Sequence, residues 1–344
     1  MKIRRALALA AVYIGAVIGA GFLSGQEIWH FVARHGRAAF WASLLIAVFF
    51  IILAPFLYRA GSRAGIENYQ DFFYRYLPGP WPYLFDLFYS LFLLGSVAVM
   101  MAGAGTLFNE LLALPYLLGV SFSIVFLLLT LLLKSEGLLT VNSILIPVLV
   151  LITLYLLITF LRKEASFTGL ALPGTISPGL LWVKDGLFYG AYNLAMAIAV
   201  MTPIIYGEEE GTILAGAIIG GIVITLLLLL IALGLQQAYP LGPEGEIPLL
   251  YLAARTGKGL YIGYIIVLYF AMLTTALANY YAFSKRFALF LALPYEITLF
   301  AGLFLILPLL PSGFSTLVNK LYPFFGGLAL VIIFLYIIIY LEEA

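Results

Sequence analysis

Ten stretches of about 20 mainly apolar residues follow one another along this chain of 344 residues. A helix rises about 1.5 Å per residue, so each stretch is long enough to cross the roughly 30 Å hydrocarbon core of a bilayer. Backbone polar groups in lipid must bond internally, and the sequence therefore predicts an all-α integral membrane protein of about ten transmembrane helices. The predicted spans are Ala6–His30, Ala38–Tyr58, Tyr83–Phe108, Leu114–Leu133, Val141–Leu161, Leu181–Tyr206, Ile213–Leu235, Leu260–Phe283, Phe287–Ile306 and Thr316–Leu341.

The composition disfavours several classes of function. Charged residues make up 10% of the chain, against about 25% in soluble domains. The net charge is +1 with no polybasic patch, so no nucleic-acid partner is expected. Cysteine is absent, and no H-E-x-x-H, nucleophile elbow or paired catalytic carboxylates within one span occur, so we expect neither an enzyme nor an organic cofactor. The lipid bilayer is the expected surrounding, and a monomer is favoured.

The loop lengths predict an internal repeat. About 24 residues separate the second span from the third (Arg59–Pro82), and about 24 separate the seventh from the eighth (Gln236–Gly259). Each loop holds a short amphipathic piece, Ile66–Leu77 and Ile247–Arg255. An odd number of spans per unit forces the two units into opposite orientations, which is a 5+5 inverted repeat. We expect one transmembrane domain, 1–344, with repeats at about 6–161 and 181–341.

The first span contains the run G-A-V-I-G-A-G-F-L-S-G-Q-E, from Gly15 to Glu27. Each interior glycine costs a helix roughly 0.5–1 kcal/mol relative to alanine. Broken helices persist in lipid only where they line a cavity or bind something, so the run predicts a first span unwound near Gly19–Gly21. The alternative is that these glycines only permit close helix packing.

The repeat predicts a matching break in the sixth span. The equivalent position lies near Met196, close to the polar pair Tyr192 and Asn193, and Pro203 follows. The alternative is that Asn193 only bonds a neighbouring helix. A substrate pocket is expected between the two breaks. Freed amides would suit an anionic group such as a carboxylate, and the predicted lining is Gly19, Ala20, Gly21, Phe22, Tyr192, Asn193 and Met196.

Gln26 and Glu27 follow the predicted break in the first span. A carboxylate within a span points to a function by default. Glu27 could bind a cationic amine, gate the pathway or carry a proton. An interfacial ion pair with the nearby His30, Arg34 or Arg37 is the alternative.

A second polar group lies in the eighth span, where Thr274 and Thr275 offer adjacent hydroxyls. Such oxygens, together with freed carbonyls, could hold a hard monovalent cation such as sodium. Threonines in membrane helices also commonly bond back to a carbonyl of the preceding turn and do nothing else. Among the other charges, Asp86 and Asp185 lie at span starts, where the helix dipole favours them. Glu208, Glu209 and Glu210 form a loop for which Lys285 and Arg286 are possible partners.

The Gly15–Glu27 run resembles the opening of the YkvI-like family of bacterial membrane proteins, which belongs to the amino acid–polyamine–organocation superfamily. The ten-span plan is similar to the LeuT fold of that superfamily. This resemblance implies a prokaryotic inner (plasma) membrane, and the even span count with basic residues at the N-terminus favours cytoplasmic termini.

The resemblance also implies a function. Sodium-coupled members hold one sodium ion between the first and eighth helices. By that resemblance, Gly15, Ile18 and Ala271 would supply carbonyls, and Thr274 and Thr275 hydroxyls. The expected function is secondary transport of a small solute, an amino acid or amine, coupled to sodium by alternating access. The alternatives are proton coupling through Glu27, or a ligand-sensing membrane subunit similar to those of germinant receptors.

Overall fold

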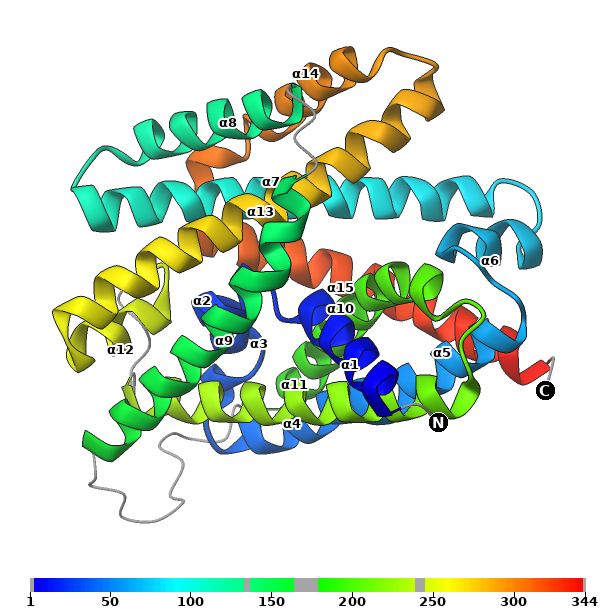
Figure 1. Ribbon diagram of the computed structural model, residues 1–344, viewed down its shortest axis with the longest axis horizontal. Helices are drawn as coiled ribbons and strands as arrows, with labels where there is room; N and C mark the ends of the chain where they lie inside the picture. Colours follow the sequence, from blue (N-terminus) through cyan, green and yellow to red (C-terminus); the bar gives the residue numbers. More distant parts are fainter. Residues whose placement is uncertain (1–2, 133–136, 164–178, 239–244, 343–344) are drawn as a thin grey trace.

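The computed structural model describes residues 3–132, 137–163, 179–238 and 245–342, and all regular structure in those residues is helical (Figure 1). Seven helices are long and apolar enough to cross a membrane, and two shorter apolar helices cover Tyr116–Leu132 and Pro147–Arg162. The prediction of an all-α, multi-pass membrane protein is therefore confirmed.

The first half of the chain forms the first five spans. The first span comprises three short helices, and the second is interrupted by a π-helical turn, η2. The elements are α1 (Ile3–Val17), α2 (Ala20–Ser24), α3 (Gln26–Phe31), η1 (Ala33–Ala38), α4 (Ala39–Ala47), η2 (Val48–Leu53), α5 (Ala54–Arg63), α6 (Tyr69–Tyr76), α7 (Trp81–Leu112), α8 (Tyr116–Leu132) and α9 (Gly137–Lys163).

The second half repeats the plan. Its elements are α10 (Leu181–Ile205), α11 (Glu210–Ala238), α12 (Pro248–Thr256), α13 (Lys258–Leu291), α14 (Tyr295–Ile306), η3 (Leu310–Ser312) and α15 (Phe314–Glu342). The predicted boundary between the eighth and ninth spans was wrong. The eighth helix continues to Leu291 and ends where Ala292 adopts a positive φ of 53°, so the ninth begins at Tyr295 rather than Phe287.

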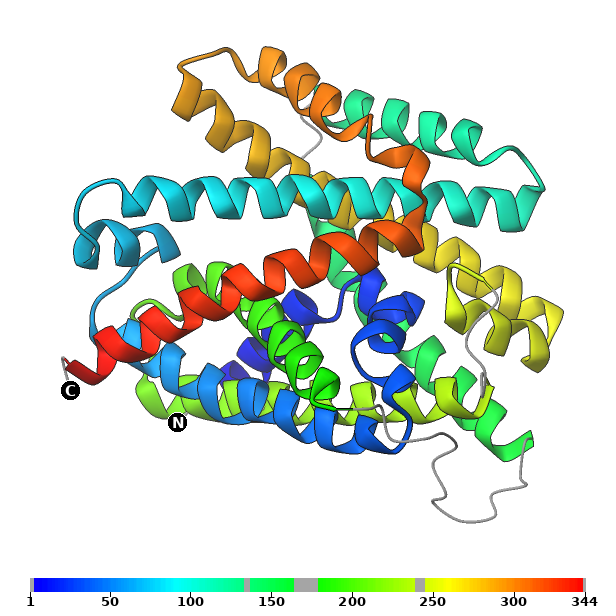
Figure 2. The ribbon, with the colours of Figure 1, turned by 180° about the vertical axis from the view of Figure 1, so that it is seen from behind.

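The short surface helices show the inverted relation between the halves. Helix α6 lies within the predicted amphipathic piece Ile66–Leu77, and α12 matches the piece Ile247–Arg255 to within one residue. They occupy opposite ends of the molecule, whereas both chain termini lie near one end (Figures 1 and 2). This is the placement that two five-span units of opposite orientation require. The predicted linker between the halves falls mostly on residues 164–178, outside the described residues.

Two groups of helices pack against each other. In the first group, which we call the bundle, α1 packs on α10 and α11, and α4 and α5 pack on the same two helices. In the second, which we call the scaffold, α7 packs on α8 and α13, and α14 packs on α13. Figure 1 shows the scaffold in the upper part and the bundle in the lower part. Helix α15 contacts both α10 and α7 and so lies between the groups.

Close approach within the bundle depends on glycine. A Cβ atom at Gly220 of α11 would lie 2.7 Å from Cδ1 of Tyr13, and one at Gly221 would lie 2.2 Å from the carbonyl oxygen of Phe50. Small residues at such contacts let backbones approach and gain van der Waals packing, which helps to hold helices together in lipid. The bundle can therefore form one closely packed unit.

Candidate functional site

The first span is broken where the glycine run predicts it. Helix α1 ends at Val17, and Gly19 is extended, with φ −97° and ψ −176°. The amide of Gly19, which a continuous helix would direct to Gly15, donates instead to the carbonyl of Val17 at 3.0 Å. The break thus frees the Gly15 carbonyl from its ordinary partner. The prediction of an unwound first span is confirmed.

A second interruption follows at Gly25, which adopts the left-handed conformation with φ 84° and ψ −11°. Leu249 of α12 packs on this residue so closely that a Cβ at Gly25 would lie 2.9 Å from its Cγ. The Ser24 hydroxyl donates to the Gly21 carbonyl at 2.6 Å and accepts from the Gln26 amide at 3.2 Å. The sequence did not separate this turn from the first break, although Gly25 belongs to the same glycine run.

The predicted break in the sixth span is wrong. Helix α10 runs unbroken from Leu181 to Ile205, through Met196 and with Pro203 in its last turn. The Asn193 side-chain amide donates to the carbonyl of Tyr189 at 3.0 Å, one turn earlier in the same helix. Its polar group is therefore satisfied locally without unwinding the backbone. Met196 is partly buried on the same helix.

Glu27 lies at the centre of the site. Its side chain is buried, with 5% of the residue exposed, and Oε2 accepts a hydrogen bond of 2.8 Å from the Tyr192 hydroxyl. The other oxygen lies over the break, because a Cβ at Gly21 would be only 1.8 Å from Oε1. The alternative of an interfacial ion pair does not hold, since Arg34 pairs with Asp185. The structure thus brings together Gly21, Glu27 and Tyr192 of the predicted site.

Aromatic side chains from four elements surround Tyr192. Its ring centroid lies 5.8 Å from that of Phe31 on α3, 6.1 Å from Phe92 on α7 and 5.2 Å from Tyr322 on α15. Tyr189, one turn earlier on α10, lies 5.4 Å away, and its buried hydroxyl finds no hydrogen-bond partner in the described part of the chain. The sequence missed this cluster, because aromatic residues on separate spans carry no signal of their proximity.

The remaining predicted pocket residues lie around this centre. Ala20 and Phe22 are buried in α2, and Gly19 precedes them at the break. The side-chain amide of Gln26 donates to the hydroxyl of Ser315 at 2.7 Å and so links α3 to α15. Gln26 therefore joins the first span to α15, the helix between bundle and scaffold.

The residues predicted to hold sodium are placed on α1 and α13. Ala271 and Thr274 are buried, and Thr275 is partly buried. The Thr274 hydroxyl donates to the carbonyls of Phe270 at 3.0 Å and Ala271 at 3.1 Å, which is the local bond of the alternative interpretation. Its oxygen still has lone pairs to offer a cation. The main contacts of α13 with the first span fall on α2, where Tyr264 donates to the Leu23 carbonyl.

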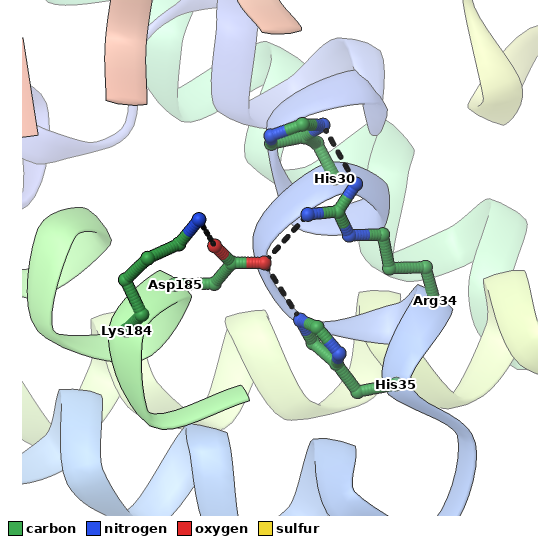
Figure 3. Close-up of polar contacts among 5 residues, drawn as sticks. All are labelled: His30, Arg34, His35, Lys184 and Asp185. Atoms are coloured by element: carbon green, nitrogen blue, oxygen red, sulfur yellow. Dashed lines mark hydrogen bonds and ion pairs between the residues drawn. The ribbon is translucent and has the colours of Figure 1, made fainter. Parts of the chain in front are cut away.

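A charged cluster joins the far end of the first span to the start of α10 (Figure 3). The buried Asp185 accepts from Nη2 of Arg34 at 2.6 Å and pairs with Nε2 of His35 at 2.9 Å. Nη1 of Arg34 also lies 3.3 Å from Nδ1 of His30, and Lys184 approaches Asp185 at 3.8 Å. Asp185 is therefore held by side chains, rather than by the helix dipole alone as its position suggested.

Other charges also find partners that the sequence did not indicate. Asp86 pairs with Arg286 and accepts from Gln70 at 2.9 Å. Glu208 pairs with Arg5 at 2.6 Å. The remaining pairs of the acidic loop join Glu210 to Arg59 and Arg63. The suggested pairing of this loop with Lys285 or Arg286 was wrong for Glu208 and Glu210, because bundle arginines on α1 and α5 lie closer.

A small pocket lies between α5, α10 and α15. Its lining includes none of the predicted site residues and consists of Leu57, Tyr58, Gly61, Ile66, Ile198, Thr202, Ile205, Tyr336 and Tyr340. Glu27 and Tyr192 are each only 5% exposed, so their contact is closed off from solvent in this conformation.

Two proteins of Bacillus subtilis (strain 168) are similar in sequence. The uncharacterized membrane protein YkvI is 27% identical over 332 residues, which cover 94% of this chain and 93% of YkvI. The uncharacterized protein YyaD is 26% identical over 321 residues, which cover 92% of this chain and 91% of YyaD. No protein-family model matches the chain.

Solved structures share the fold. The inward-facing conformation of Mhp1 aligns with a TM-score of 0.71 at 16% identity, over 94% of this chain and 73% of Mhp1. Mhp1, a nucleobase-cation-symport-1 family transporter, in a closed conformation with bromovinylhydantoin bound aligns with a TM-score of 0.63 at 16% identity, over 94% and 77%. A manganese transporter of Eremococcus coleocola aligns at 0.54 and 13% identity, over 94% and 76%. The chain is therefore similar to YkvI and YyaD over more than 90% of its length, and it shares the LeuT-type fold of Mhp1.

Proposed function

We propose that the protein is a secondary transporter that moves a small solute across the inner membrane of a prokaryotic cell by alternating access. The solute binds beside the break in the first span, where Glu27 meets Tyr192. One observation carries the proposal: an interrupted membrane helix whose break is covered by a buried carboxylate. Both features are costly in lipid, where unpaired backbone groups and buried charges are unfavourable, so they persist where they serve a site.

The fold supports this proposal. The solved neighbours include a nucleobase-cation-symport-1 family transporter and a manganese transporter. The packing separates a bundle from a scaffold, with the site between them. The TM-score is higher for the inward-facing conformation of Mhp1, 0.71, than for the closed one, 0.63. We interpret the described conformation as inward-facing, with both termini in the cytoplasm. Rocking of the bundle against the scaffold would then expose the site to the other side.

Sodium is the coupling ion that we propose first. The carbonyls of Gly15 and Ile18 flank the break, and the Gly15 carbonyl lacks the amide partner of a continuous helix. Ala271, Thr274 and Thr275 on α13 would complete a set of neutral oxygens. Sodium binding across α1 and α13 would then favour one arrangement of bundle and scaffold over the other. Coupling requires that ion and solute bind more tightly together than apart, by about 1–3 kcal/mol.

A proton is the second candidate, and the position of Glu27 favours it. Among the described residues, no ion pair includes Glu27. In the described part of the chain, its hydrogen-bond partner is the neutral Tyr192 hydroxyl. A buried carboxylate without a cation can be neutralised by a proton, which makes it a carrier when access alternates.

Flux measurements test the proposal. Purified full-length protein is screened for stabilisation by small amino acids and amines, in sodium and in potassium. Solutes that stabilise it are then measured for counterflow in proteoliposomes, under an imposed sodium gradient and under an imposed pH gradient. Counterflow supports a transporter, and the gradient that accelerates it identifies the ion. Stabilisation without any counterflow would reject transport in favour of a ligand-sensing subunit.

A further inference from the structure

We infer that the site at Glu27 takes a small organic ammonium cation that carries no carboxylate of its own. The inference rests on the proposed function for the location of the site, the break in the first span. It narrows the expected solute class, an amino acid or amine, to the amine. Three features of the site lead to it.

A carboxylate of the chain itself already lies against the break. The sequence predicted that freed amides around Gly21 would receive the carboxylate of a solute. In the structure, Oε1 of Glu27 lies so close to Gly21 that a Cβ atom there would be 1.8 Å away. A second carboxylate would meet this negative charge in a buried setting, where like charges repel strongly. An amino acid is therefore a poor fit, whereas its decarboxylated amine lacks the group that is repelled.

The charge of Glu27 has no balancing cation within the described residues. Its partner Tyr192 is neutral, and the nearby Arg34 and His35 are engaged by Asp185. A buried carboxylate is favourable when it is paired, so an ammonium group from outside would supply the missing charge. Ammonium N–H groups also form short, strong hydrogen bonds with carboxylate oxygens.

The walls of the site suit a cation as well. The rings of Phe31, Phe92, Tyr189 and Tyr322 lie 5.2 to 6.1 Å from that of Tyr192, from four different elements. Aromatic faces attract alkylammonium groups, and the attraction increases when water is excluded. The buried Tyr189 hydroxyl has no partner in the described part of the chain. Its oxygen can accept a further N–H bond.

Matched pairs of solutes test the inference directly. Isoamylamine and leucine differ by the carboxylate, as do phenethylamine and phenylalanine, and isoamyl alcohol keeps the alkyl chain without charge. Binding to the full-length protein is measured by thermal shift and isothermal titration calorimetry. We expect both amines to bind, and both amino acids and the alcohol to bind at least about tenfold more weakly. Equal or tighter binding of the parent amino acids would overturn the inference.

Substitutions at Glu27 provide a second test of the inference. Glu27→Gln keeps the shape and removes the charge, and it should weaken amine binding roughly 100-fold, whereas Glu27→Asp should retain part of it. The control Glu296→Gln changes an exposed carboxylate at the start of α14 and should bind as the wild type does. Wild-type affinity in folded Glu27→Gln would reject the inference, and so would a loss in Glu296→Gln as large as that in Glu27→Gln.

The two proposals fail differently. Amine binding that depends on Glu27 but gives no counterflow would reject transport and leave the inference standing. Counterflow of leucine with no binding of isoamylamine would reject the inference and leave transport standing.

Discussion

The hydroxyl of Tyr192 donates a 2.8 Å hydrogen bond to the carboxylate of Glu27, across 165 residues of sequence. This bond joins α3, the last short helix of the first span, to α10, the unbroken sixth span. One side of the site therefore belongs to an interrupted span, and the other side belongs to the continuous helix α10.

Tyr192→Phe should destabilise the folded protein by about 1.5–3 kcal/mol, because the variant leaves a buried carboxylate oxygen without its donor. The apparent unfolding temperature in detergent measures this. Tyr189→Phe is the matched control, since the hydroxyl of Tyr189 has no partner to lose among the described residues. Equal losses in the two variants would show that the bond to Glu27 contributes nothing.

Gly21→Ala should abolish solute binding with a smaller effect on folding. The added methyl group would occupy the position of Oε1 of Glu27, so the carboxylate must leave the break. Gly259→Ala adds a methyl group into open space at the start of α13 and should bind normally. Isothermal titration of the solute identified by the screen distinguishes them. Normal binding by Gly21→Ala would remove Glu27 from the site.

Gly25→Ala should cost more stability than the strain of a positive φ alone. At φ 84° the added Cβ is strained, and it would also lie 2.9 Å from Leu249 on α12. Gly65→Ala carries a similar strain at φ 66° in open space and sets the reference. We expect Gly25→Ala to be less stable than Gly65→Ala by about 1–3 kcal/mol, the usual range for overpacking. Thermal unfolding of both variants gives the difference.

Thr274→Ala should remove any stabilisation that is specific for sodium over potassium, because it deletes one proposed ligand. Thr202→Ala is a suitable control: Thr202 is also buried, and its hydroxyl also bonds back one turn, to Ile198, on a different helix. Thermal shifts in sodium and in potassium compare the two variants with the wild type. If the wild type shows no preference for sodium, or Thr274→Ala keeps one, the proposed cation site is wrong.

Asp185→Asn should destabilise the protein by roughly 2 kcal/mol or more, since it removes the negative charge that Arg34 and His35 share. The side chain of Arg34 is 37% exposed, which screens part of the pairing. Lys184→Gln removes only the 3.8 Å contact of a side chain that is 52% exposed, and should change stability by less than about 0.5 kcal/mol. Chemical denaturation in mixed micelles measures both. A loss in Lys184→Gln as large as that in Asp185→Asn would contradict this assignment.

Patterns among neighbouring residues were sufficient to predict the spans and the break at Gly19. Runs of apolar residues located the spans, and two equal loops located α6 and α12. Glycine acts on the backbone of its own segment, so the unwinding at Gly19 could be predicted from nearby residues alone. The prediction of a break in α10 was wrong, because it was transferred from the first span through the repeat. Two repeats can share the order of their spans without sharing the backbone conformation of each span. Gly186 and Gly190 in α10 serve packing against α4 and η2 instead, at Leu45 and Phe49.

The contacts of the site could not be predicted in the same way. Which face of a span meets which neighbour depends on helix rotation and tilt, and these are set by packing across the whole assembly. Thus Glu27 and Tyr192 were each identified as candidates, but their bond was not. Asp185 was explained by its place at a helix start, whereas Arg34 and His35, about 150 residues away, hold it.

The two sides of the first break have different neighbours. Helix α1 packs mainly on α11, and α2 packs mainly on α13. Any rotation of α11 relative to α13 must therefore be absorbed as a change of dihedral angles at Ile18 and Gly19. The Ile18 carbonyl, one of those proposed to ligate a cation, belongs to this joint, so ligation and bending would involve the same peptide unit. A bound ion would stiffen the joint, and its departure would release it.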